Sequence, residues 1–399
     1  MTSKVFPLVT ATVSIFTIIA VTIFYTPLNM MIRIPFVSNA NQLDSVHSFL
    51  AAVPYGQWIP FEPRPDALRE VLSFSNYVRH ELYGLPSKQR PDGTCGNTTV
   101  TSTKNANQKY RSLCSSAGPT PCCHDNHCVD RDKDQCACAQ CIDERREIHA
   151  DFARYVMCSS SHQLTQFTSP RSVCDVMSNV TFHVYGDSLA AQVYLALLTK
   201  AVGGNITRLF AAKTPQDEKR KCQGQRMYPK KCRRWMKEVW GFPSCEFPGE
   251  MSATYVPINK VNKTRLKNLV RRLALTPNSV LYVGIGVNKI LSASWVNSAV
   301  LQPILEAKGH SRWPYVIVAG LHHWGVLRSP TYLSTSAVRS FNQELKTLLS
   351  KYGMTYFDTY ELTRNVFSYD GTHYGQGVNQ VKADILLNVI QMIKQETVQ

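Results

Sequence analysis

The chain has 399 residues, 44% of them hydrophobic, which is enough for one large or two modest domains with a buried core. Its 44 basic and 28 acidic side chains give a net charge of +16, which favours an acidic glycan or an anionic membrane as a partner. A solvated basic surface explains that charge equally well. The aromatic and glycine signature of nucleic-acid modules is lacking, so nucleic acid is excluded as an expected partner.

The first predicted element is a membrane anchor. Residues 5–25 form an uncharged apolar run that suits one bilayer crossing of about 20 residues, whereas a cleaved signal peptide has an apolar core of about 7–15 residues. We therefore expect a cytosolic tip and transmembrane signal anchor over residues 1–25 and a stem over residues 26–54. All cysteines and glycosylation sequons follow the anchor. This order predicts a single-pass type II protein of the Golgi or another secretory-pathway membrane, with its body in the lumen.

Residues 55–178 are predicted to form a cysteine-rich region. It should contain a helix at 66–82, an exposed polar loop at 90–117 and a second helix at 142–156. Six cysteines lie within 20 positions, beside two histidines, which allows either a zinc site or a disulfide knot. A luminal location favours the disulfide knot, and we expect no metal. The cluster comprises Cys122, Cys123, Cys128, Cys136, Cys138 and Cys141, with His124 and His127.

The cysteine count and the sequons together indicate an oxidising, glycosylating compartment. The chain has 13 cysteines, an odd number, so at least one thiol must be free or paired with another chain. Four Asn-x-Thr sequons are predicted glycosylation sites. They are Asn97, Asn179, Asn205 and Asn262.

Residues 179–399 alternate short apolar strands with amphipathic segments, the pattern of a parallel α/β sheet. Strands are predicted at 180–185, 206–211, 279–285, 315–319 and 354–358, and helices at 189–201, 263–275, 336–352 and 377–394. Between them, residues 213–237 hold ten basic and two acidic side chains. This basic stretch could hold an acidic glycan or be a solvated loop. The nearby Cys222, Cys232 and Cys245 indicate a disulfide-stapled loop.

A serine lies at the corner between the first of these strands and its helix, in Gly186-Asp187-Ser188. A hydroxyl placed after a strand and at the start of a helix is exposed, and the helix N–H groups beside it can stabilise an anion. This is the geometry that a nucleophilic serine requires. The motif is short, however, and arises often by chance.

Two further stretches could complete such a site. Asn288 follows the strand at 279–285, and its amide could donate to a developing oxyanion at the same sheet edge, although an asparagine that caps its own loop is the simpler reading of that residue. Asp370 and His373 precede the closing helix. A histidine can activate a serine by taking its proton while a carboxylate orients the ring, but in isolation an Asp N-cap beside an exposed histidine is the better interpretation of this stretch.

Taken in this order, the three stretches resemble the blocks of the SGNH, or GDSL-like, hydrolases. The resemblance implies a three-layer α/β fold, with a parallel sheet flanked by helices. It implies Ser188 as nucleophile, His373 as base and Asp370 as its orienting acid, with Asn288 and the Ser188 N–H in the oxyanion hole. The matching residues are Gly186-Asp187-Ser188, Gly286-Val287-Asn288 with Lys289 where the family has Asp, and Asp370-Gly371-Thr372-His373.

The family also places an oxyanion glycine after its second strand, and Gly224 and Gly241 are both candidates here. The anchor, the cysteine-rich region and Gly56-x-Trp58 are most similar to the PC-esterase branch, whose members transfer or remove acyl groups on glycans. Two histidines at the sheet edge, His322 and His323, either line the substrate pocket or are ordinary loop residues.

The resemblance implies a serine-dependent acyl esterase or O-acyltransferase, with acetyl as the expected group. It would act on glycans in the secretory pathway through an acyl-enzyme at Ser188, without a metal or organic cofactor. The alternative is a catalytically inactive SGNH-like module that binds a glycan or a protein. Lys289 and the unassigned glycine keep this alternative open.

Overall fold

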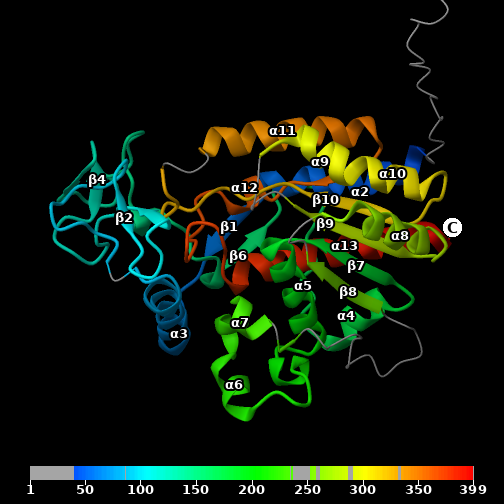
Figure 1. Ribbon diagram of the computed structural model, residues 1–399, viewed down its shortest axis with the longest axis horizontal. Helices are drawn as coiled ribbons and strands as arrows, with labels where there is room; N and C mark the ends of the chain where they lie inside the picture. The colour runs from blue at the N-terminus through cyan, green and yellow to red at the C-terminus, as the bar shows by residue number, and fades with distance from the viewer. Residues whose placement is uncertain are drawn as a thin grey trace, which may run out of the picture. The chain divides into compact units, whose positions relative to one another are not determined.

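A five-stranded parallel sheet forms the centre of the structure, a computed structural model that describes residues 40–85, 87–233, 235–236, 252–257, 261–285, 291–330 and 334–398. The strands lie in the order β11-β10-β9-β7-β8, and every neighbouring pair is parallel (Figure 1). The sheet confirms the predicted α/β class. Its strands are β7 (Thr181–Gly186), β8 (Ser252–Pro257), β9 (Ser279–Gly284), β10 (Tyr315–Ala319) and β11 (Thr355–Phe357).

Helices cover both faces of this sheet and produce three layers (Figure 1). Successive side chains of a strand point to opposite faces, so β9 sends Val280 and Tyr282 into one core and Leu281 and Val283 into the other. The first core is covered by α2 (Ala40–Ala52), α4 (Pro170–Met177), α5 (Ser188–Ala201) and α13 (Gln376–Val398). The second is covered by α8 (Lys263–Ala274), α9 (Ala293–Val296), α10 (Gln302–Lys308) and α11 (Thr335–Lys351).

Helix α8 shows how local sequence builds one of these layers. Its buried residues are Leu266, Leu269, Val270 and Leu273, spaced three and four apart on one face. The Asn262 side chain accepts a hydrogen bond from the Arg265 N–H at 2.9 Å and begins the helix. The predicted amphipathic helix at 263–275 is thereby confirmed.

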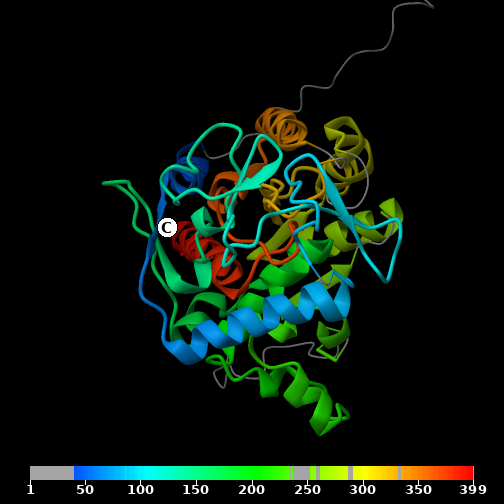
Figure 2. The same cartoon turned by 90° about the vertical axis from the view of Figure 1, so that its left-hand side faces the viewer.

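The cysteine-rich region lies at one end of the sheet (Figures 1 and 2). Its longest helix is α3 (Pro65–Asn76), which continues as a π-helix, Tyr77–Leu82, and so confirms the helix predicted at 66–82. The region also contains three short antiparallel pairs, the first of which uses a strand that precedes α3. They are β1 (Gln57–Pro60) with β6 (Ala153–Val156), β2 (Thr99–Thr101) with β3 (Lys109–Arg111), and β4 (Cys122–His124) with β5 (His127–Val129).

Disulfides account for all six clustered cysteines, as the disulfide interpretation predicts. A further disulfide lies within the basic stretch. The short helices of this stretch are α6 (Gln216–Lys221) and α7 (Lys230–Arg233). Cys158 is exposed and has a free thiol, and Cys245 lies outside the described residues. The bonds are Cys95–Cys123, Cys114–Cys128, Cys122–Cys136, Cys138–Cys141 and Cys222–Cys232.

Three predicted elements are wrong. Residues 90–117 are not simply an exposed polar loop: they contain the β2–β3 pair, and Tyr110, Leu113 and Cys114 are buried because the hairpin packs against the rest of the structure and is held by disulfides. Residues 206–211 form a 3-10 turn, Ile206–Leu209, because the buried Ile206, Leu209 and Phe210 follow helical spacing and pack into the first core. The second strand in chain order is instead β8, at the sheet edge. Residues 142–156 form two 3-10 turns and β6 rather than a helix, because residues 153–156 pair with β1, almost 100 positions earlier.

The structure describes the end of the predicted stem but not the predicted membrane anchor. The last part of the stem, 40–52, is helix α2, whose Val46, Phe49 and Leu50 are buried in the first core. The predicted membrane-spanning run, 5–25, lies outside the described residues. Within the described ranges, no helix combines the length and apolar character needed to cross a membrane.

Candidate active site

Ser188 lies directly after β7, at a point where the sheet order changes direction. The chain leaves β7 for β8 on one side and later enters β9 on the other. In open α/β sheets, the carboxyl ends of strands on either side of such a switch point form the usual ligand-binding crevice. The nucleophile proposed from the sequence is therefore placed where this class of fold binds its ligands.

The turn before Ser188 requires glycine because three backbones approach closely. A Cβ added to Gly186 would lie 2.3 Å from the Ala190 Cβ and 2.5 Å from the Gly284 carbonyl oxygen. Real Cβ atoms do not tolerate such distances, so a larger residue would push α5 away from β9. Close packing of this turn fixes where the serine side chain leaves the sheet.

Helix α5 begins at Ser188 with Asp187 as its N-cap. The Asp187 carboxylate accepts a hydrogen bond from the Leu189 N–H at 2.9 Å. As the first residue of the helix, Ser188 has a backbone N–H without a partner inside the helix, and the helix dipole favours negative charge there. This N–H can therefore serve as one donor to an oxyanion that develops beside the serine.

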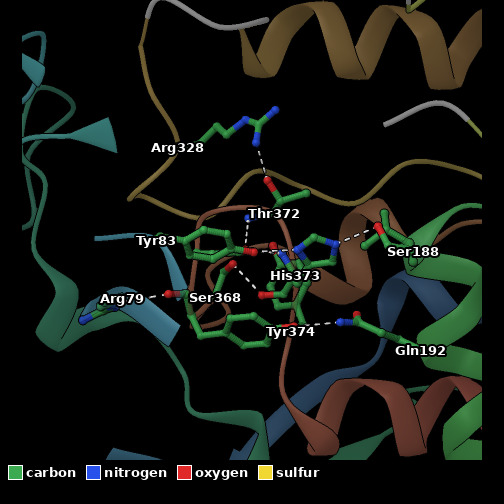
Figure 3. Close-up of polar contacts among 12 residues, drawn as sticks. Arg79, Tyr83, Ser188, Gln192, Arg328, Ser368, Thr372, His373 and Tyr374 are labelled. Carbon is green, nitrogen blue, oxygen red and sulfur yellow. Dashed lines mark hydrogen bonds and ion pairs between the residues drawn. The ribbon is translucent and has the colours of Figure 1, made fainter. Parts of the chain in front are cut away.

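Three predicted residues form one hydrogen-bonded row (Figure 3). The Ser188 Oγ lies 2.7 Å from the His373 Nε2, and the His373 Nδ1 lies 2.7 Å from the Asp370 Oδ2. Ser188 comes from the start of α5, whereas the other two come from the turn before α13. The row has the order in which an imidazole takes a proton from a hydroxyl while a carboxylate holds its other nitrogen.

Asp370 is held by four hydrogen bonds. Its Oδ1 accepts from the backbone N–H groups of Thr372 and His373 at 2.8 and 2.7 Å, and its Oδ2 accepts from the Tyr83 hydroxyl at 3.0 Å as well as from the His373 ring. Burial disfavours the charged form, but the His373 charge and these hydrogen bonds outweigh burial and hold the pKa of Asp370 below its usual value. Asp370 is therefore an ionised acceptor at neutral pH.

The histidine ring is positioned by packing as well. Tyr369 stacks on His373 with ring centroids 6.1 Å apart and an interplanar angle of 11°. The Tyr369 hydroxyl accepts a hydrogen bond from the Gln192 side chain of α5 at 2.7 Å (Figure 3). The Ser368 hydroxyl donates to the His373 carbonyl at 2.7 Å. These contacts restrict both the ring and the turn that carries it.

The predicted oxyanion residues have different outcomes. Asn288 and Gly241 lie outside the described residues. Gly224 begins a 3-10 turn and faces the Glu70 side chain of α3, where an added Cβ would lie 1.8 Å from a carboxylate oxygen. Among the described residues, the Ser188 backbone N–H is the donor available for an oxyanion hole. The second donor remains a prediction.

The two predicted pocket histidines lie in different surroundings. His323 lines a cavity of about 310 Å³ beside the cysteine-rich region, together with Glu147 and Trp324. His322 is buried and its Nε2 is hydrogen-bonded to the Nζ of Lys382, a buried lysine of α13. Burial, Lys382 and then His373 lower the pKa of His322 well below its usual value, so it is a neutral residue of the core.

Sequence reasoning missed three contributors to the site: Tyr83, Gln192 and Lys382. A signal existed for Lys382, because it interrupts the apolar stripe of α13 four positions after Val378. Burial lowers the pKa of Lys382, while the nearby Asp187 opposes that shift. No local pattern marks the other two.

The comparisons with known proteins give only distant structural likenesses. No family model matches the chain, and neither does any curated protein. A member of the lipolytic protein G-D-S-L family from Veillonella parvula is 15% identical with a TM-score of 0.28, over 52% of this chain and 97% of that one. The periplasmic domain of a lipopolysaccharide acetyltransferase from Salmonella ser. Paratyphi A is 14% identical with a TM-score of 0.27, over 56% of this chain and 86% of that one. TM-scores this low do not show that the proteins belong to one family, so a function can be argued only from the geometry of the site.

Proposed function

We propose that this protein is an SGNH-type serine acyl esterase or O-acyltransferase that works through an acyl-enzyme at Ser188. The observation that carries the proposal is the hydrogen-bonded row of Ser188, His373 and Asp370 at the switch point of a parallel sheet. A buried, ionised carboxylate on one ring nitrogen and a serine on the other is the arrangement that activates a hydroxyl for acyl transfer.

The reaction follows from these positions. His373 Nε2 takes the Ser188 proton as Oγ attacks the acyl carbonyl, and Asp370 stabilises the imidazolium that forms. The Ser188 N–H, with Asn288 as the second proposed donor, stabilises the oxyanion. The imidazolium then protonates the leaving alcohol. Water or a sugar hydroxyl attacks the acyl-enzyme next, so hydrolysis and transfer use the same residues and differ in the acceptor.

The proposed substrate is a glycan that carries or receives an acetyl group, and the proposed location is the lumen of the Golgi or another secretory compartment, with the chain anchored through residues 5–25. Disulfide pairing of the cysteine-rich region supports an oxidising compartment. All four sequon asparagines, Asn97, Asn179, Asn205 and Asn262, are exposed and open to glycosylation.

The test is acetyl turnover by the full-length protein and its Ser188→Ala variant. An activated acetyl ester serves as donor, without and with a panel of glycan acceptors, and released acetate and acetylated glycan are both measured. We expect wild type to turn over the ester and the variant to lose turnover while it keeps glycan binding. An inactive binding module would show no ester turnover in wild type and no change in the variant.

A further inference from the structure

The cysteine-rich region places a tyrosine in the active site. The Tyr83 hydroxyl donates to the Asp370 Oδ2 at 3.0 Å, the same oxygen that accepts from the His373 ring (Figure 3). Tyr83 precedes Asp370 by 287 positions in the sequence. The negative charge of Asp370 and then burial raise the pKa of Tyr83, so the phenol keeps its proton and acts as a donor.

The backbone of Tyr83 is held by the segment that follows β2. The Ser102 hydroxyl donates to the Tyr83 carbonyl at 2.5 Å, and the Thr103 N–H donates to the Gly84 carbonyl at 2.8 Å. The Tyr83 ring packs against the ring of Tyr110 on β3, with centroids 6.0 Å apart. The position of the phenol is therefore set by the β2–β3 hairpin rather than by α3 alone.

Disulfides in turn hold this hairpin. Cys95–Cys123 joins the segment before β2 to β4, and Cys114–Cys128 joins the segment after β3 to β5. The β2–β3 pair is only three residues long on each strand, and so small a hairpin is marginally stable by itself. Covalent closure supplies the rigidity that a precise contact to Asp370 requires.

The same hairpin contacts the other side of the catalytic turn. The Arg111 N–H donates to the Leu327 carbonyl at 3.0 Å, and Tyr110 forms an isolated β-bridge with Arg328. The Arg328 guanidinium then donates to the Thr372 hydroxyl, inside the turn that carries Asp370 and His373 (Figure 3). The β2–β3 hairpin thus contacts the turn at two points, through Tyr83 and through Arg328.

We propose that Tyr83 is a positioning residue of the catalytic row, and that the disulfide-bonded region is thereby an integral part of the active centre. The inference rests on the proposed function. With Oδ1 held by two backbone N–H groups and Oδ2 held by Tyr83, the carboxylate cannot rotate away from His373. A fixed carboxylate keeps the imidazole in the tautomer and orientation that accept the serine proton.

The test compares Tyr83→Phe with Tyr352→Phe in the full-length protein. Each change removes one hydroxyl and keeps the ring, but the Tyr352 hydroxyl, at the end of α11, accepts a hydrogen bond from Gln302 at 2.8 Å and is not part of the catalytic row. The readout is the second-order rate of Ser188 labelling by a fluorophosphonate, measured across pH 5–9, with the melting temperature as a check of folding. The charged or titratable groups around the catalytic row include Tyr110, Tyr369, Tyr374, His322, Arg328 and Arg233.

We expect Tyr83→Phe to lower the plateau labelling rate by about tenfold, the size expected for one hydrogen bond to a charged group. Loss of that donor also leaves the Asp370 carboxylate a stronger acceptor for the imidazolium, so the acid limb of the rate profile should move to higher pH. Tyr352→Phe should label like wild type. A purely structural role for Tyr83 would lower the melting temperature without moving the acid limb.

The outcomes separate the inference from the function on which it rests. If the wild-type protein is labelled but Tyr83→Phe has the same labelling rate and pH profile as wild type, the inference is overturned and the proposed function stands. A lower melting temperature with an unmoved acid limb would overturn it too. Absence of labelling on folded wild type would overturn both the proposed function and this inference.

Discussion

Replacing Asp370 by Asn tests the orienting role of the carboxylate, because the structure dictates which way the amide must face. Two backbone N–H groups point at Oδ1, at 2.7 and 2.8 Å, so the amide oxygen has to take that position. The amide NH₂ then occupies the Oδ2 position, 2.7 Å from the His373 Nδ1. The reverse orientation would place an NH₂ against two backbone donors that cannot turn away, whereas on the other side the Tyr83 hydroxyl can rotate and accept a hydrogen bond from the NH₂.

The consequence is a reversed tautomer. An NH₂ facing Nδ1 favours the ring with its proton on Nε2, and that nitrogen can no longer accept the proton of Ser188. Loss of the base and of the charge that stabilises the imidazolium should lower the reaction rate by about 10³–10⁴, equivalent to about 4–5.5 kcal/mol of transition-state stabilisation.

The assay is fluorophosphonate labelling at pH 8, followed by intact-mass spectrometry, with the melting temperature measured on the same sample. Asp358→Asn is the matched control, because that carboxylate also accepts two backbone N–H bonds, from Tyr360 and Glu361, but among the described residues it forms no hydrogen bond with a histidine. The control should label at the wild-type rate. Labelling of folded Asp370→Asn within tenfold of wild type would refute the orienting role.

Two further predictions concern the sheet that carries the site. Gly186→Ala should destabilise the fold by about 2 kcal/mol or more, since its Cβ would lie 2.3 Å from the Ala190 Cβ, and chemical denaturation would measure the loss; an unchanged unfolding midpoint would contradict it. Burial lowers the pKa of His183 on β7 to about 4, below its unfolded value of about 6.5. Between pH 6.5 and pH 4, His183 is protonated in the unfolded state but not in the folded state. The free energy of unfolding should therefore fall by about 3 kcal/mol as the pH drops from 6.5 to 4, and His183→Phe should make this fall smaller. Equal slopes in the two proteins would show that His183 does not titrate this way.

The sequence predicts the elements whose apolar pattern is continuous and local. β7, β9 and β10 are buried on both faces, so their largely apolar sequences are visible without any knowledge of their neighbours. The row of Ser188, His373 and Asp370 is predicted only by the resemblance of three short motifs, taken together, to the SGNH hydrolases, since each motif alone has a simpler interpretation.

The elements that sequence reasoning misplaced depend on distant partners. β8 is an edge strand with a weakly apolar sequence, whereas residues 206–211 are apolar enough for a strand but follow helical spacing. β6 exists because β1 pairs with it. Tyr83 reaches Asp370 only because the disulfide-bonded hairpin docks on the catalytic turn, and no local pattern carries that information.

The most direct test of the proposed activated serine is intact-mass spectrometry of the full-length protein, with and without a fluorophosphonate, on wild type and Ser188→Ala. An activated Ser188 predicts a single adduct on wild type that is lost in the variant. No adduct on folded wild type, or an adduct that persists in Ser188→Ala, would contradict the account.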